Sequence, residues 1–128
     1  MKVLALDYGK ARTGVAVSDP TGAIARPLTV LSDDVVARVA ELVREEEVEL
    51  VVVGLPLTLR GERGRQVAET ERFIDALRRV VDVPVESFDE RFTTTLAAQA
   101  PRGDAPEDAR AAAHLLTGYL TWRSGRAS

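Results

Sequence analysis

The first nineteen residues constrain the fold most strongly, because they hold two β-prone segments separated by a short turn. Val3–Leu6 is an apolar run, residues 8–11 have turn composition, and Thr13–Val17 is a second run of β-forming residues. This pattern predicts two antiparallel strands joined by a hairpin turn. Asp7 ends the first strand, in the middle of the expected sheet, where an unpaired carboxylate is costly. Asp7 is therefore either a turn residue that accepts backbone hydrogen bonds ahead of Gly9 or one side of a metal site.

Size and composition limit the possible functions. A chain of 128 residues with 45% hydrophobic and 29% charged residues predicts one globular domain with a sizeable core. No apolar run approaches the roughly 20 residues of a membrane span, and no signal peptide opens the chain, so we expect a cytoplasmic location and no membrane partner.

Without cysteine, a metal has to bind oxygen or the single His114. The net charge of -3 argues against a general nucleic-acid binder, but it does not decide where charge is placed.

The rest of the chain alternates β-prone and helical segments. Residues 23–31 predict a third strand, and Pro27 places it at a sheet edge. The further expected elements are a helix from about 35 to 45, a buried strand at 50–53 halted by 54–56, a polar loop at 60–65, a helix through Leu77, a strand at 83–85, a short helix at 96–100 and a last helix at 107–122. The order predicts an α/β fold with a mixed five-stranded sheet, three antiparallel strands followed by two parallel strands through helical crossovers, and helices on both faces. We expect one domain at 1–122 and a flexible tail at 123–128.

Polar residues follow three of these strands at the same edge. Asp7 ends the first strand, Gly54 follows the strand at 50–53, and Asp89 and Glu90 follow the strand at 83–85. Parallel strands end on one side of a sheet, and ligands of such sheets collect there. The sequence therefore predicts a functional site at this edge.

The last helix supplies a further acidic residue. Asp108 shares a helical face with Ala112, Leu115 and Tyr119, which are the residues expected to pack on the sheet. Asp108 therefore points toward the protein, although a favourable charge at a helix N-terminus is an alternative reason for its presence. His114 lies about 240° around the same helix and is expected at the surface or partly packed.

Four stretches of the chain, in order, resemble the YqgF (RuvX) family. They are Leu6–Gly9 with Arg12–Asp19, Val53–Pro56, Asp89–Thr94, and Asp108 with Ala111, Ala112, Leu115 and Leu116, and together they span residues 1 to about 122. The resemblance implies an RNase H-like fold related to the RuvC Holliday-junction resolvases. It also implies a nuclease that processes the ends of precursor 16S ribosomal RNA in ribosome biogenesis. By motif, it assigns catalysis and metal binding to Asp7, Glu90 and Asp108.

The chemistry of this family gives those three carboxyls a role. Phosphodiester hydrolysis in this fold class uses two divalent cations, and Mg²⁺ or Mn²⁺ prefer carboxylate oxygens. Without a cation, three converging carboxylates raise one another's pKa. Lys10 and Arg12, in the turn after Asp7, are candidates for binding substrate phosphates, and a solvated hairpin turn is the alternative.

The roles of several other residues have two interpretations. Arg91 is expected to bind either a phosphate or a carboxylate, and Asp89 either supports the site or forms a turn. The loop before residue 108 is less basic than the family pattern leads one to expect, and Thr117 stands where a glutamine is common. Substrate contact could fall instead on the loop arginines at 60, 63 and 65, for which a solvated helix entry is the alternative.

Three functions remain open at this stage. The first is a metal-dependent nuclease that acts on RNA, with ribosomal precursor particles as partners. The second is a nuclease selective for four-way DNA junctions, which needs two active sites and therefore a dimer. The third is a nucleotide- or ribosome-binding module without catalysis, because Asp7-Tyr8-Gly9 also looks like the first phosphate motif of actin-like ATPases. We expect a monomer or weak homodimer.

Overall fold

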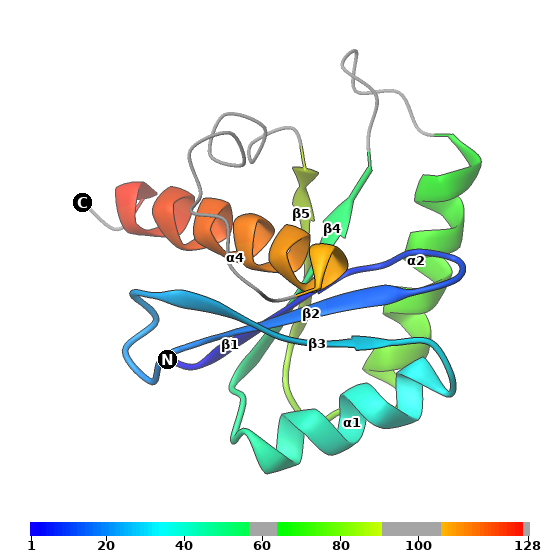
Figure 1. Cartoon of the computed structure of the whole chain (residues 1–128), viewed down its shortest axis with the longest axis horizontal. Coiled ribbons are helices and arrows are strands. Elements are labelled where there is room, and N and C mark those ends of the chain that lie inside the picture. The colour runs from blue at the N-terminus through cyan, green and yellow to red at the C-terminus, as the bar shows by residue number, and fades with distance from the viewer. Residues whose placement is uncertain (57–63, 91–105, 127–128) are drawn as a thin grey trace.

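The computed structural model describes residues 1–56, 64–90 and 106–126 (Figure 1). Its strands form one sheet in the order β3-β2-β1-β4-β5. The strands are β1 (Val3–Asp7), β2 (Thr13–Ser18), β3 (Ala25–Leu31), β4 (Leu50–Leu55) and β5 (Val85–Asp89). β2 pairs antiparallel with β1 and β3, whereas β4 pairs parallel with β1 and β5. The predicted mixed sheet is therefore confirmed, with β3 at an edge.

Helices cover both faces of the sheet. α1 (Val35–Glu45) and α2 (Arg65–Arg78) lie on one face, and α4 (Glu107–Arg126) crosses the other (Figure 1). No helix in these described ranges combines the length and apolar character needed to cross a bilayer.

The alternation of side chains along β1 decides where Asp7 points. Leu4 and Leu6 belong to the core under α1 and α2, and Val3 and Ala5 belong to the core under α4. Because successive side chains of a strand point to opposite faces, Asp7 continues the α4 side. This side is where the predicted last helix begins.

Two strands extend further than predicted. β5 occupies Val85–Asp89 rather than residues 83–85, and β4 continues through Gly54 to Leu55. The two extensions pair with each other, since Gly54 is opposite Phe88 and Leu55 is opposite Asp89. Glu86 and Ser87 are polar and exposed on this edge strand. A prediction based on apolar residues alone therefore ends the strand too early. β4 ends at Leu55, within the expected stop at residues 54–56, although two residues later than residue 53.

Helix ends also differ from the prediction. α2 begins at Arg65, which was expected in a loop, and α4 continues to Arg126 rather than ending near Trp122. No proline follows Trp122, so nothing in the local chemistry stops the helix there. The predicted helix at 96–100 and the arginines at 60, 63 and 91 lie outside the described residues.

Candidate acidic active site

Asp7 is held in place by its neighbours along the chain. Tyr8 points to the opposite face and stacks on Phe73 of α2, with ring centroids 4.3 Å apart and planes 22° from parallel. This contact fixes the start of the β1–β2 turn against α2. Asp7 therefore points to the α4 side, where its side chain is half-buried. A simple turn role for Asp7 does not account for this inward orientation.

Glu90 reaches Asp7 because of its position just after β5. Asp89 pairs with Leu55, whose side chain belongs to the core under α1 and α2, so Asp89 points to that face. Phe88 belongs to the core under α4, and the next residue on its side is Glu90. Register therefore separates the two adjacent acids, and only Glu90 lies on the same face as Asp7.

The carboxyls of Asp7 and Glu90 are hydrogen-bonded to each other. Burial, and then the negative charge of Asp7, raises the pKa of Glu90 to about 7. Burial is also the largest cause of the raised pKa of Asp7, to which the charge of Asp108 adds. The hydrogen bond lowers the pKa of Asp7 and raises that of Glu90, which places the shared proton on Glu90. The raised pKa of Glu90 means that the pair keeps a proton to a higher pH than two isolated carboxyls would.

Asp108 lies in the first turn of α4 and its charge is met by an arginine. Arg12 Nε donates to Asp108 Oδ2 across 2.9 Å. The two side chains are 67% and 38% exposed, so the pair contributes only about 0.5 kcal/mol to stability. Arg12 is thus placed beside the carboxyl group, where an arginine can exchange between a carboxylate and a phosphate.

The donor set suits a hard divalent cation. Carboxylate oxygens are the ligands that Mg²⁺ and Mn²⁺ prefer. Over residues 1–56, 64–90 and 106–126, no three such side chains are gathered closely enough to hold an ion as they stand. Asp7 and Glu90 are hydrogen-bonded to each other, while Asp108 is held in an ion pair with Arg12. The three carboxyl side chains are suitable ligands for a divalent cation once Glu90 has lost its proton and Asp108 has left Arg12.

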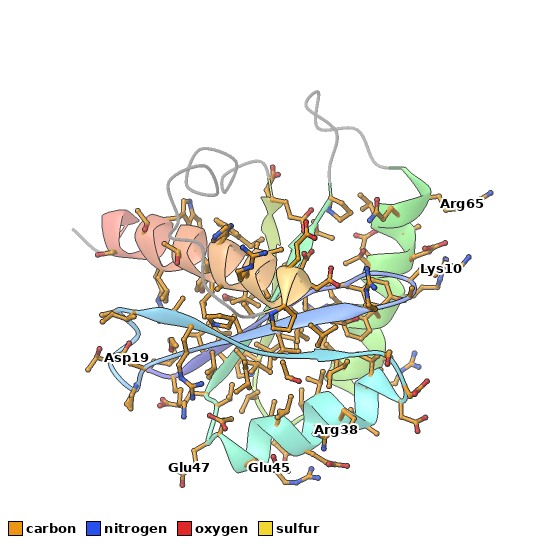
Figure 2. All side chains as sticks on the ribbon, viewed as in Figure 1. Lys10, Asp19, Arg38, Glu45, Glu47 and Arg65 are labelled. Carbon is orange, nitrogen blue, oxygen red and sulfur yellow. The ribbon has the colours of Figure 1, made fainter. Side chains whose placement is uncertain are left out.

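Two further predicted contact residues in the described part of the chain, Lys10 and Arg65, lie away from this group. Figure 2 shows Lys10 extending into solvent at the tip of the β1–β2 hairpin, and Arg65 pointing outward from the start of α2. His114 is half-buried on α4. Of the tentative phosphate ligands in the described residues, the structure brings only Arg12 to the carboxyls.

Asp19 belongs to the motif shared with the family but not to the acidic group. Its carboxylate accepts backbone hydrogen bonds from Thr21, Ala23 and Ile24 in the β2–β3 turn. Those bonds, together with the Thr21 hydroxyl, hold the pKa of Asp19 well below its usual range. Figure 2 shows it at the opposite end of the sheet from Lys10. Asp19 is a turn residue.

The acidic group is separate from a cavity that the described residues form elsewhere. A cavity of about 800 Å³ lies at the other end of β4 and β5, where Leu50, Pro84 and Trp122 are among its lining residues. None of the three carboxyls lines it. The perturbed carboxyls, rather than the size of a hollow, identify the candidate site.

Comparison with known proteins agrees with the family resemblance. The RuvX family, described as Holliday junction resolvase, matches residues 1–122. A protein of Chloroflexus aggregans named "Putative pre-16S rRNA nuclease" is 44% identical over 94% of both chains. A Rhodococcus opacus protein of the same name is 42% identical over 94% of this chain and 78% of that one. Among solved structures, T. thermophilus RuvC in complex with Holliday junction substrate has a TM-score of 0.66, with 22% identity over 98% of this chain and 96% of that chain. At that identity the structural likeness establishes the fold alone.

Proposed function

The chain belongs to the RuvX family, and we propose that it is a metal-dependent nuclease that hydrolyses phosphodiester bonds at the ends of precursor 16S ribosomal RNA. Its 44% identity to a relative named for this activity, over 94% of both chains, supports nuclease function and a nucleic-acid substrate. The single observation that carries the proposal is the convergence of Asp7, Glu90 and Asp108 from β1, the end of β5 and the start of α4.

The three carboxyls are proposed as the catalytic and metal-binding residues, with two Mg²⁺ or Mn²⁺ ions. When bound, such ions lower the pKa of a coordinated water and neutralise charge on the phosphate oxygens. In the metal-free chain, Glu90 keeps its proton up to about pH 7 and donates it to Asp7. Because ligands have to be deprotonated, we expect affinity for Mn²⁺ to rise with pH through this value.

Arg12 is proposed to have two successive partners. In the metal-free chain it neutralises Asp108 at 2.9 Å. Once Asp108 turns to a cation, the guanidinium is free to hold a phosphate oxygen of the substrate. Lys10 and Arg91 remain proposed phosphate ligands, and Lys10, at the tip of the β1–β2 hairpin, would contact the substrate away from the three carboxyls. We also propose that precursor ribosomal particles are the natural partner, and that the chain acts as a monomer or weak homodimer.

A four-way DNA junction is the second candidate substrate. The printed description of the matched family, Holliday junction resolvase, favours it. The same carboxyls would serve, because the bond broken is again a phosphodiester. Symmetric cutting of a junction requires two sites, so this activity requires a dimer.

The test offers the purified chain three substrates: a precursor 16S RNA fragment, an unstructured RNA and a four-way DNA junction. Each is incubated with Mg²⁺, with Mn²⁺ and with EDTA. We expect metal-dependent cleavage of the precursor, and preferential cleavage of the junction would instead select the second candidate.

Three variants and one control locate the site. Asp7→Asn, Glu90→Gln and Asp108→Asn should each slow cleavage by more than about 100-fold, since ligands matter at least as much as the groups that orient them. Glu45→Gln is the matched control, because Glu45 is exposed on α1, far from the acidic group (Figure 2). If all three variants cut as fast as the control, the assigned site is wrong. Cleavage that survives EDTA would refute metal dependence.

A further inference from the structure

Asp7 lies between two glycines on the same face of the sheet. Its direct partner on β2 is Gly14. On β4, the residue beside Leu6 is Val53, so Gly54 comes next to Asp7. The three positions form one row across β2, β1 and β4, and the row faces α4. The only side chain in this row is therefore the Asp7 carboxyl.

The space above Gly54 is filled by Glu90. A Cβ added at Gly54 would lie 2.7 Å from Glu90 Oε1 and 2.9 Å from Glu90 Cγ. It would also lie 3.0 Å from Leu115 Cδ2. Carbon atoms do not approach this closely without a shift, because dispersion contacts have their optimum near 3.5–4.0 Å. The atom most free to move is the carboxyl end of Glu90, so a methyl group here would displace the carboxyl before it displaced the backbone.

The space above Gly14 is filled by the backbone of α4. A Cβ added at Gly14 would lie 1.9 Å from the carbonyl oxygen of Asp108 and 3.2 Å from the amide nitrogen of Ala109. No side-chain rotation relieves such a contact, so the whole first turn of the helix would have to lift. Gly14 is what allows Asp108 to lie directly over the start of β2, beside Asp7.

We propose that Gly14 and Gly54 are positioning residues of the acidic site, whose missing side chains provide the room in which Asp108 and Glu90 approach Asp7. Neither glycine touches the reacting atoms. Gly14 positions the helix that carries Asp108, and Gly54 positions one side chain. The inference rests on the proposed function for the role of the carboxyls, but the positions themselves can be tested without activity.

Gly54→Ala is the decisive variant, and Gly64→Ala is its matched control. Gly64 has nothing within 4 Å of an added Cβ and an extended backbone that alanine adopts. In a crystal structure of Gly54→Ala, we expect the Glu90 carboxyl outside hydrogen-bonding distance of Asp7 and the sheet unchanged. If the two carboxyls stay hydrogen-bonded, the proposal is overturned.

Affinity for Mn²⁺, measured by calorimetry, gives a second readout. Gly54→Ala should weaken binding by about 10-fold to 100-fold, as loss of an orienting group does, and Gly64→Ala should not. In a chain that already carries Glu90→Ala, Gly54→Ala has no carboxyl to displace. There the second substitution should change Mn²⁺ affinity by less than about 2-fold. Such non-additive effects are expected of two residues in contact. An equal loss in both backgrounds would overturn the proposal.

Folding and metal binding are separated by the same variants. If Gly54→Ala fails to fold and Gly54→Ala/Glu90→Ala folds, the collision with Glu90 is demonstrated. If neither folds, the glycine serves the packing of Leu115 or the backbone, and the proposal is wrong. If the parent chain binds no Mn²⁺, metal dependence fails while the crystal structures still decide the role of Gly54.

Discussion

Replacement of Glu90 by glutamine should make the protein more stable above neutral pH. In the parent chain, Asp7 and Glu90 share one proton, and its loss leaves two negative charges in a half-buried contact. Glutamine has similar size, carries no charge and can donate an amide hydrogen to Asp7 at any pH. The variant therefore removes the repulsion while it keeps the contact.

The pKa of Glu90 sets the size and sign of this effect. The value rises from 4.5 to about 7 on folding, so between these pH values the folded chain binds more protons than the unfolded chain. The free energy of unfolding consequently falls as the pH rises through this window. The whole shift corresponds to about 3 kcal/mol. Because Glu90 is partly exposed, solvent screening reduces this to about 1 to 2 kcal/mol.

Urea denaturation at about pH 5 and about pH 8 measures the effect. The difference in unfolding free energy between Glu90→Gln and the parent should grow by about 1 to 2 kcal/mol in favour of the variant. Glu45→Gln, on an exposed part of α1, controls for the loss of a charge elsewhere. A difference that stays constant to within about 0.5 kcal/mol, or that grows in favour of the parent, would refute the shared-proton description.

Three further substitutions test other contacts. Thr13→Val should stabilise the chain by about 1 kcal/mol in urea denaturation, because the buried Thr13 hydroxyl has no hydrogen-bond partner among the described residues; a loss of stability would contradict this. Gly14→Ala should cost about 3 kcal/mol in the same assay, since its Cβ meets the Asp108 carbonyl oxygen; a cost below about 1 kcal/mol would show that α4 moves freely. Arg12→Ala should change stability by less than about 1 kcal/mol, because its ion pair with Asp108 is exposed. In calorimetry the same variant should bind Mn²⁺ at least as tightly as the parent, and weaker binding would show that Arg12 supports the ion rather than competing with it.

The positions of Asp7 and Asp108 could be predicted because each depends on one local rule. Asp7 ends a buried strand, and Asp108 lies on the helical face that carries Ala112 and Leu115. Strand direction and helical periodicity then place both on one side of the sheet. The structure agrees with each of these placements, although their catalytic roles stay a prediction.

The choice between Asp89 and Glu90 could not be made from local pattern. It depends on the pairing of β5 with β4, and the strand was expected to end four residues too early. If Glu86 and Ser87 are taken as exposed residues of an edge strand, the strand extends past residue 85. Side chains then alternate between the two faces, and Glu90 lies on the same face as Phe88. Family resemblance supplied the residue instead.

The sequence places Gly54 at the functional edge, but it does not show why either Gly14 or Gly54 has to be a glycine. A glycine beside a strand end has turn chemistry as its usual explanation. The actual constraint is the close approach of Glu90 to Gly54 and of the α4 backbone to Gly14, and both partners are distant in sequence. The ion pair between Arg12 and Asp108 is equally non-local. Such contacts follow from packing and cannot be read from neighbouring residues.

The central claim is that Asp7, Glu90 and Asp108 form one cation site. Anomalous diffraction from crystals grown with Mn²⁺ above neutral pH tests it most directly. We expect manganese density bound to carboxylate oxygens of all three residues, with Arg12 moved off Asp108. Density at another site, or a manganese-saturated crystal in which Asp7 and Glu90 stay hydrogen-bonded to each other with no manganese beside them, would contradict this site.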